Sequence, residues 1–146
     1  MKAPLVSHSS EFVTSGHEMN FHTTKLSIEP SYLAPDGSEI RLLPNVRGGG
    51  LSHCTLPAGG VSQAVKHKTV DEIWYFLEGE GQVWRKLGED DRTVDVHPGI
   101  APTIPVGTHF QFRANDSHSL RFLIATIPIW PGEDEADKVE NYWLRQ

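Results

Sequence analysis

A histidine and a glutamate separated by four residues, His67 and Glu72, are the side chains in this sequence best suited to chemistry. An imidazole and a carboxylate can exchange protons with a bound molecule or take part in holding a divalent metal. If both side chains face one pocket, the charge of Glu72 raises the pKa of His67 and makes the histidine a proton carrier near neutral pH. The sequence therefore predicts a site built around this pair.

The pair lies within the first of two spaced motifs. The first motif is Gly59, five residues, Val65-Lys66-His67, four residues, Glu72, six residues and Gly79. The second motif is Gly99, five residues and Pro105-Val106-Gly107-Thr108-His109-Phe110. These motifs, in this order and at this separation, resemble the two signatures of the cupin family. The resemblance covers about residues 50–127, which is most of a cupin barrel.

The resemblance implies four metal-ligand positions, and two of them carry unusual residues. Val65 and Phe110 stand where the family has histidines, whereas His67 and Glu72 match the family pattern. A metal held by one imidazole and one carboxylate would be weakly bound, since tight sites supply three or more ligands. His109 adds a third ligand only if a bulge turns it inward, because neighbouring strand side chains point to opposite faces. The candidate metal ligands are therefore His67, Glu72 and His109, and the cofactor stays open between none and one divalent metal.

The other candidate site residues lie on strands that the resemblance places around the barrel. An apolar and aromatic pocket would suit a flat or hydrophobic small molecule, although plain core packing accounts for such residues equally well. Arg113, beside the pocket strand, is the best candidate to bind a carboxylate or another polar group. The predicted ligand-binding residues are Val65, Trp74, Phe76, Trp84, Phe110, Phe112 and Arg113.

Short segments rich in β-forming residues recur along the chain, with glycine and proline turns between them. This pattern is typical of a sandwich or barrel. Together with the resemblance, it predicts an all-β fold, a double-stranded β-helix or jelly-roll barrel over residues 25–130. Residues 1–24 are predicted to form a polar N-terminal arm. Residues 131–146 are predicted to form a short helical or extended tail, and Trp130 is expected to dock on the barrel or on a second subunit.

The composition argues against several classes of protein. The chain has 13 basic and 19 acidic residues, a net charge of −6 at pH 7, so a nucleic acid would be repelled. Cys54 is the only cysteine, which argues against an internal disulfide or a thiolate-rich metal site. No apolar run reaches the ~18 residues of a membrane span, and no secretory signal is recognisable at the N-terminus. We expect a cytoplasmic protein that binds a small molecule and forms a homodimer, as cupins often do, with neither nucleic acid nor membrane as a partner.

The sequence leaves open whether the chain is an enzyme. It favours a small-molecule-binding cupin that performs metal-free acid–base chemistry of the isomerase or lyase type, in which His67 moves the proton and Glu72 orients it. One alternative is a metal-dependent lyase or dioxygenase with an atypical ligand set. Another alternative is a non-catalytic binding module for an apolar small molecule.

Overall fold

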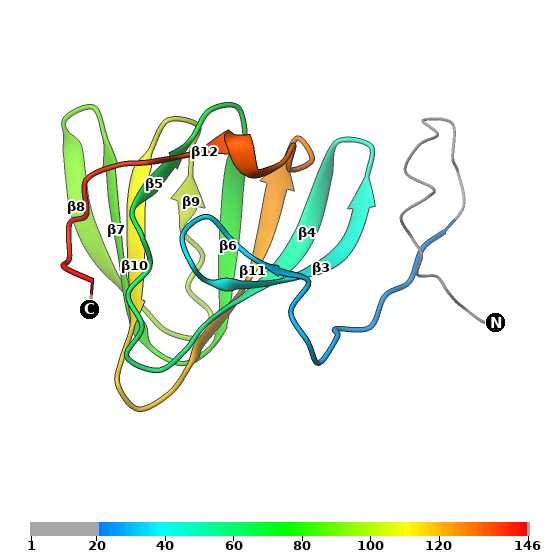
Figure 1. Cartoon of the computed structure of the whole chain (residues 1–146), viewed down its shortest axis with the longest axis horizontal. Coiled ribbons are helices and arrows are strands. Elements are labelled where there is room, and N and C mark those ends of the chain that lie inside the picture. Colours follow the sequence, from blue (N-terminus) through cyan, green and yellow to red (C-terminus); the bar gives the residue numbers. More distant parts are fainter. Residues whose placement is uncertain (1–20, 146) are drawn as a thin grey trace.

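Two antiparallel β-sheets form nearly all of the regular structure of the computed structural model, which describes residues 21–145 (Figure 1). The strands are β2 (Tyr32–Leu33), β3 (Glu39–Val46), β4 (Gly49–Leu56), β5 (Val65–His67), β6 (Asp71–Glu78), β7 (Gly81–Leu87), β8 (Asp90–Val96), β9 (Thr103–Ile104), β10 (His109–Ala114), β11 (Leu120–Ile127) and β12 (Ala136–Lys138). A 3-10 turn, η2, spans Glu133–Glu135. The strand orders are β12-β5-β10-β7-β8 and β2-β3-β4-β11-β6-β9. The prediction of an all-β barrel is confirmed.

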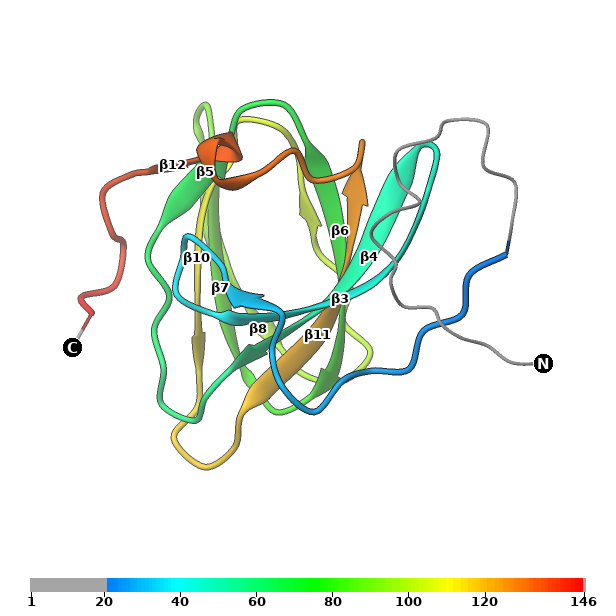
Figure 2. The same ribbon diagram turned by 45° about the vertical axis from the view of Figure 1, so that its right-hand side comes forward.

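The two sheets lie opposite each other and enclose the core, as the rotated view shows (Figure 2). Successive side chains on a strand point to opposite faces, so each strand contributes every second residue to the interior. On β6, Trp74 and Phe76 are buried, whereas Ile73 and Tyr75 on the other face are about half exposed. Aromatic rings from β6, β10 and β11 meet in the middle, with centroids 4.5–6.2 Å apart among Trp74, Phe76, Phe110, Phe112 and Phe122.

The chain after β11 crosses one end of the barrel and then joins the other sheet (Figure 2). β12 pairs antiparallel with β5, so that Ala136 lies opposite His67. Apart from η2, the predicted tail is extended rather than helical. The predicted arm over residues 1–24 lies mostly outside the described residues. Within residues 21–145, no helix is long and apolar enough to cross a membrane.

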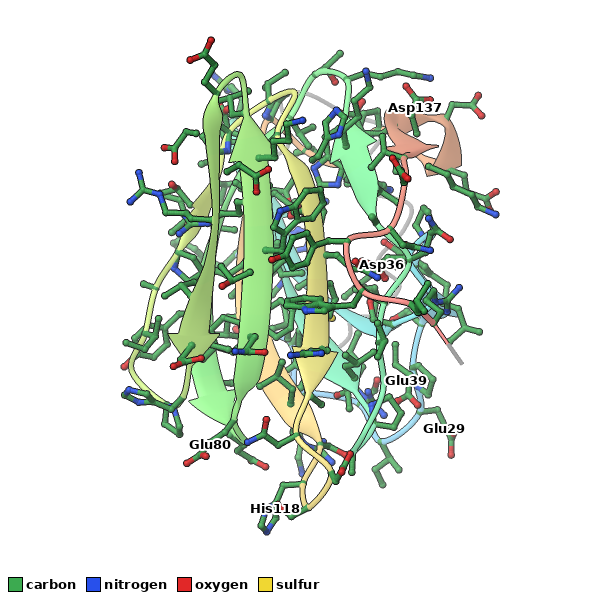
Figure 3. The ribbon with its side chains drawn as sticks, turned by 90° about the vertical axis from the view of Figure 1, so that its left-hand side faces the viewer. Glu29, Asp36, Glu39, Glu80, His118 and Asp137 are labelled. Carbon is green, nitrogen blue, oxygen red and sulfur yellow. The ribbon has the colours of Figure 1, made fainter. Side chains whose placement is uncertain are left out.

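The last described residues lie against part of the outer face of the sheet that contains β10 (Figure 3). The buried side chain of Gln111 organises this cover, because its Oε1 accepts hydrogen bonds from the backbone N–H groups of Tyr142 and Trp143, each at 2.8 Å. The ring of Tyr142 stacks on Trp84, with centroids 5.1 Å apart. The guanidinium of Arg113 lies 4.3 Å from the ring centroid of Trp143. One face of this sheet therefore faces the barrel interior, and the tail covers its other face around Trp84, Gln111 and Arg113.

Gly79, in the turn between β6 and β7, should be required by the fold. Its backbone has φ 84°, a conformation that disfavours any side chain, and an added Cβ would collide with the carbonyl oxygen of Ser119. We expect Gly79→Ala to lower the free energy of unfolding by about 3 kcal/mol, measured by urea denaturation. Gly48→Ala is the matched control, because a Cβ at Gly48 meets no atom within 4 Å. Equal stability of the two variants would contradict the prediction.

Candidate functional site

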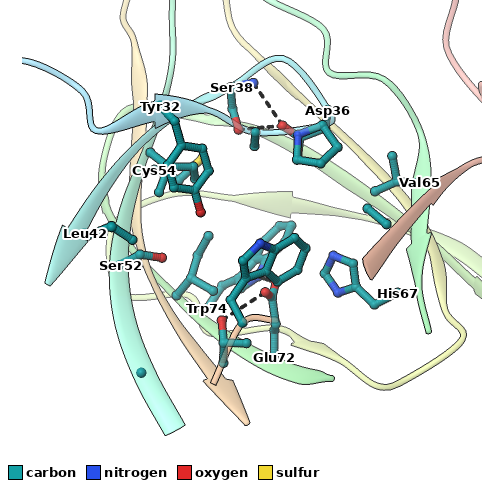
Figure 4. Close-up of a pocket in the computed structure, with 18 of the residues that line it drawn as sticks. Tyr32, Asp36, Ser38, Leu42, Ser52, Cys54, Val65, His67, Glu72 and Trp74 are labelled. Carbon is teal, nitrogen blue, oxygen red and sulfur yellow. Dashed lines mark hydrogen bonds between the residues drawn. The ribbon is translucent and has the colours of Figure 1, made fainter. Parts of the chain in front are cut away.

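A cavity of about 460 Å³ lies inside the barrel, between the two sheets (Figure 4). Its walls come from β2, β3, β4, β5, β6, β10, β11 and β12, from the turn between β2 and β3, and from the chain between β11 and β12. The aromatic residues among those that line it are Tyr32, Trp74, Phe110, Phe112, Phe122 and Trp130. His67 and Glu72 also line this cavity, so the predicted pair meets in one chamber.

Glu72 is the polar group held most firmly in the chamber. Its side chain is 6% exposed, and both carboxylate oxygens accept hydrogen bonds. The indole Nε1 of Trp74 donates to Oε1 and the hydroxyl of Thr126 donates to Oε2, each at 3.0 Å. Burial raises the pKa of Glu72 to about 7 against the opposing effect of these hydrogen bonds, and the charge of Asp36 adds to the rise. Near neutral pH this carboxyl is therefore divided between its protonated and ionised forms.

His67 lies at the end of β5 and is buried among aromatic rings. Phe110 and Trp130 contact its ring edge to face, with centroids 5.1 Å away in both cases. Burial lowers the pKa of His67 to about 4, although the charge of Glu135 opposes the change. The imidazole is therefore neutral at pH 7, and its buried Nδ1 has no hydrogen-bond partner among the described residues.

The expected division of roles within the pair needs correction. The sequence suggested that Glu72 would raise the pKa of His67 and make the histidine the proton carrier. Instead, removal of water from around the imidazole is the larger effect and lowers its pKa. Glu72, whose pKa moves in the opposite direction, is the group that titrates near neutrality.

The four positions that the family resemblance assigned to metal ligands come together, but only two carry donor atoms. Val65 and Phe110 lie opposite each other in the pairing of β5 with β10, and both line the cavity. His109 lies on the other face of β10, because β10 pairs with β7 in unbroken register and no bulge turns the histidine inward. This corrects the expected three-ligand set of His67, Glu72 and His109.

The donor set of the chamber does not fit a tightly held metal ion. Within residues 21–145, no group of three or more His, Cys, Asp or Glu side chains is close enough to hold one. Tight sites in proteins usually supply three or more ligands.

The predicted ligand-binding residues divide into two groups. Val65, Trp74, Phe110 and Phe112 line the cavity. The other three, which do not line it, are Phe76, Trp84 and Arg113.

Each of these three residues has a physical reason for its place outside the chamber. Phe76 is fully buried in the core, where its ring packs on Phe122 at 4.5 Å. Trp84 lies opposite Gln111 in the pairing of β7 with β10, on the face that the tail covers. Arg113 shares that face, since it is two residues from Gln111, and its Nε donates to Gln82 Oε1 at 2.9 Å. The prediction that these three residues line the pocket is thereby corrected.

The sequence analysis did not identify Tyr32 and Asp36, two polar residues of the chamber, because both precede the two motifs. Tyr32 lies on β2, and Asp36 lies in the turn between β2 and β3. Figure 4 shows both on the wall across the cavity from Glu72. Asp36 Oδ1 accepts hydrogen bonds from the backbone N–H and the hydroxyl of Ser38, at 2.9 and 2.6 Å, and burial raises the pKa of Asp36. The Pro35-Asp36-Gly37 sequence indicated only a turn.

Comparisons of the sequence with known proteins show the family to which the chain belongs. A family model described as a cupin domain matches residues 52–126. An uncharacterized protein of Methanocaldococcus jannaschii is 32% identical over an alignment of 108 residues, and the alignment covers 70% of this chain and 83% of that relative.

Two solved structures illustrate the likeness in fold. The capsular polysaccharide assembling protein CapF of Staphylococcus aureus superposes with a TM-score of 0.62 at 13% identity, over 83% of this chain and 35% of CapF. Oxalate decarboxylase of Bacillus subtilis superposes with a TM-score of 0.63 at 14% identity, over 76% of this chain and 30% of that enzyme. At such low identity the likeness shows the fold alone, and the chain spans about a third of each of these two proteins.

The raised pKa of Glu72 predicts a pH-dependent difference in stability between the wild type and Glu72→Gln. The folded-state pKa of about 7 lies above the ordinary value of 4.5, so the contribution of Glu72 is fully present below pH 4.5 and is lost as the pH rises through 7. Between pH 4.5 and 8 the wild type should lose about 3 kcal/mol relative to Glu72→Gln. Urea unfolding of both proteins across this range measures the difference.

The matched control is Glu78→Gln, which changes an exposed glutamate at the end of the same strand. Its stability relative to the wild type should not vary in this way with pH. A constant difference between the wild type and Glu72→Gln from pH 4.5 to 8 would show that Glu72 titrates at its ordinary pKa.

Proposed function

This chain belongs to the cupin domain family, and on that premise we propose that it is an acid–base enzyme that binds one small organic molecule in the barrel cavity and moves a proton through Glu72. One observation carries the proposal, namely the buried carboxyl with a pKa of about 7 that faces an apolar chamber. A general acid or base is most effective when its pKa lies near the operating pH. The cavity volume of about 460 Å³ suits a small molecule.

The neighbours of Glu72 support both halves of a proton transfer. The ionised carboxylate takes a proton from one atom of the bound molecule, and the resulting acid returns a proton to another atom, so that no oxidant or reductant is needed. Trp74 and Thr126 donate hydrogen bonds that hold the carboxylate in one orientation and favour its ionised form.

His67 has a different role in this proposal from the one that the sequence suggested. A neutral imidazole with an unpartnered Nδ1 can donate or accept one hydrogen bond, according to its tautomer. Phe110 and Trp130 pack against the ring and keep its plane in place. We assign His67 to binding and orienting the molecule on which Glu72 acts.

We propose that this chemistry proceeds without a resident metal. The support is the donor set, because Val65 and Phe110 place carbon atoms at two of the four family ligand positions. Both residues are almost completely buried, so they also fill space that a metal and its bound waters would need.

A second candidate function is non-catalytic binding of an apolar molecule. The six aromatic residues of the cavity favour it, since most of the wall can contact a ligand only through apolar atoms. In that case Glu72 and His67 would only bind the ligand, and no bond between the ligand and one of its hydrogen atoms would be broken. Exchange of hydrogen between ligand and solvent distinguishes the two functions.

The predicted homodimer stays a prediction. Ile73, Tyr75 and Leu77 form an exposed apolar stripe on the outer face of β6, and their exposed fractions are 47%, 49% and 38%. A stripe of this kind supports contact with a second copy of the chain.

Proton transfer through Glu72 should be visible as deuterium incorporation into its substrate. We expect the wild type, incubated in D2O with a mixture of small organic molecules, to catalyse exchange of a carbon-bound hydrogen in at least one of them, as measured by mass spectrometry. Glu72→Gln should slow that exchange by about 10²-fold or more while remaining folded by circular dichroism. Glu78→Gln, which changes an exposed residue, should exchange at the wild-type rate. Exchange that survives in Glu72→Gln would exclude the proposed role of this carboxyl.

Restoring the two missing histidines should create a metal site. In the double variant Val65→His, Phe110→His, donor side chains occupy all four family ligand positions on the cavity wall, and we expect about one Mn²⁺ or Zn²⁺ per chain after dialysis. The wild type, treated identically, should retain less than about a tenth of that amount, as measured by elemental analysis. About one metal ion per wild-type chain, lost in His67→Ala, would refute the metal-free proposal.

A further inference from the structure

The charged side chains that line the cavity are all acidic. Asp36 and Glu72 lie in its walls, and Glu133, which is exposed, lies at its opening. No lysine or arginine is among the lining residues within the described part of the chain. Arg113, which the sequence suggested as a binder of carboxylates, lies instead on the outer face under Trp143. A negatively charged ligand would therefore meet no lysine or arginine among the lining residues. The cation that acts on Asp36 is Arg145, which lies beside the Asp36-Gly37 turn outside the cavity lining and whose charge lowers the pKa of Asp36.

The aromatic walls add to the same preference. Trp74 and Phe110 pack edge to face at 5.4 Å, and Trp130 and Phe110 each pack edge to face with His67 at 5.1 Å. The faces of aromatic rings carry partial negative charge and attract ammonium groups, most strongly when water is excluded. The neutral His67 contributes no opposing positive charge at neutral pH.

The two wall carboxyls act unfavourably on each other when both are ionised. The charge of Asp36 raises the pKa of Glu72, and both charges raise the pKa of Tyr32. A cation placed in the chamber would offset this repulsion and the cost of burying the ionised carboxyls, whereas an anion would increase both. A neutral ligand would leave them unchanged.

We propose that the cavity takes a small organic cation, namely an amine that is protonated at neutral pH and carries an apolar or aromatic body. Asp36 accepts a hydrogen bond from the ammonium group, the aromatic residues contact the apolar body, and Glu72 on the opposite wall acts on a neighbouring atom. This inference rests on the proposed function, since it names the substrate class of the same cavity. It assigns Asp36 to binding, a role that neither family motif contains.

A series of ligands that share one body and carry a positive, neutral or negative head group tests the inference. The probes are 2-phenylethylammonium, 2-phenylethanol and 3-phenylpropanoate, and the same three head groups on cyclohexyl and butyl bodies, with binding measured by calorimetry at pH 7.5. For at least one body, the ammonium compound should bind about tenfold more tightly than the alcohol, and the carboxylate about tenfold more weakly than the alcohol. Equal or tighter binding of the carboxylate, or no binding of any ammonium compound, would overturn the inference.

Asp36→Asn isolates the contribution of the charge. An asparagine oxygen can still accept the two hydrogen bonds from Ser38, so the turn should keep its shape. We expect this variant to lose the preference for ammonium over alcohol while its affinity for the alcohol stays within about twofold of the wild type. The control is Glu89→Gln, which removes the same charge from an exposed turn between β7 and β8 and should keep the preference. A preference that survives in Asp36→Asn would contradict the role of Asp36.

Failure of this inference and failure of the proposed function give different results. If deuterium exchange depends on Glu72 but the alcohol or carboxylate probes bind most tightly, the substrate class is wrong and the proton transfer stands. If the ammonium probes bind most tightly and no molecule exchanges hydrogen, the enzyme is excluded and the cavity is an amine-binding site.

Discussion

The exclusion of water from one carboxyl and one imidazole is the constraint on which the site depends. Two sheets with aromatic inner faces leave Glu72 and His67 with little solvent, and burial then disfavours the charged form of each side chain. Their pKa values consequently move in opposite directions and past one another. The carboxyl becomes the group that can gain and lose a proton near neutrality, and the imidazole becomes a neutral hydrogen-bonding group. The same aromatic walls therefore decide both the packing of the barrel and the chemistry of its interior.

The two apolar replacements at family ligand positions fit this environment. Val65 and Phe110 lie opposite each other across the β5–β10 pair and belong to the buried core. In a metal-binding barrel the ion would neutralise a nearby carboxylate, whereas here Glu72 has only the hydrogen bonds of Trp74 and Thr126 to support its ionised form. A carboxyl with this limited support keeps a high pKa, which connects the loss of the two histidines with the proton chemistry that we propose.

The unbroken alternation of β10 separates two environments that are adjacent in the sequence. Phe110 and Phe112 face the chamber, whereas His109, Gln111 and Arg113 face outward. The last described residues cover part of the outward face, since Gln111 binds the backbone of the tail and Arg113 lies against Trp143. One strand thus builds the cavity wall and also anchors the tail. This arrangement explains why Gln111 and Arg113, which directly follow the second motif, lie outside the cavity.

The barrel and the presence of His67 and Glu72 in one cavity could be predicted from the sequence, because both depend on local information. Strand-forming segments, turn glycines and the spacing of two motifs are properties of neighbouring residues, and strand alternation alone placed Phe110 inward and His109 outward. What could not be predicted depends on contacts between residues distant in the sequence. Asp36 and Tyr32 reach the cavity because β3 pairs with β4 and brings the preceding turn over the barrel, and Trp84 is covered only because the tail returns to it. The reversal of roles between His67 and Glu72 also required the tertiary structure, because a pKa set by burial depends on how much water the whole fold removes from each group.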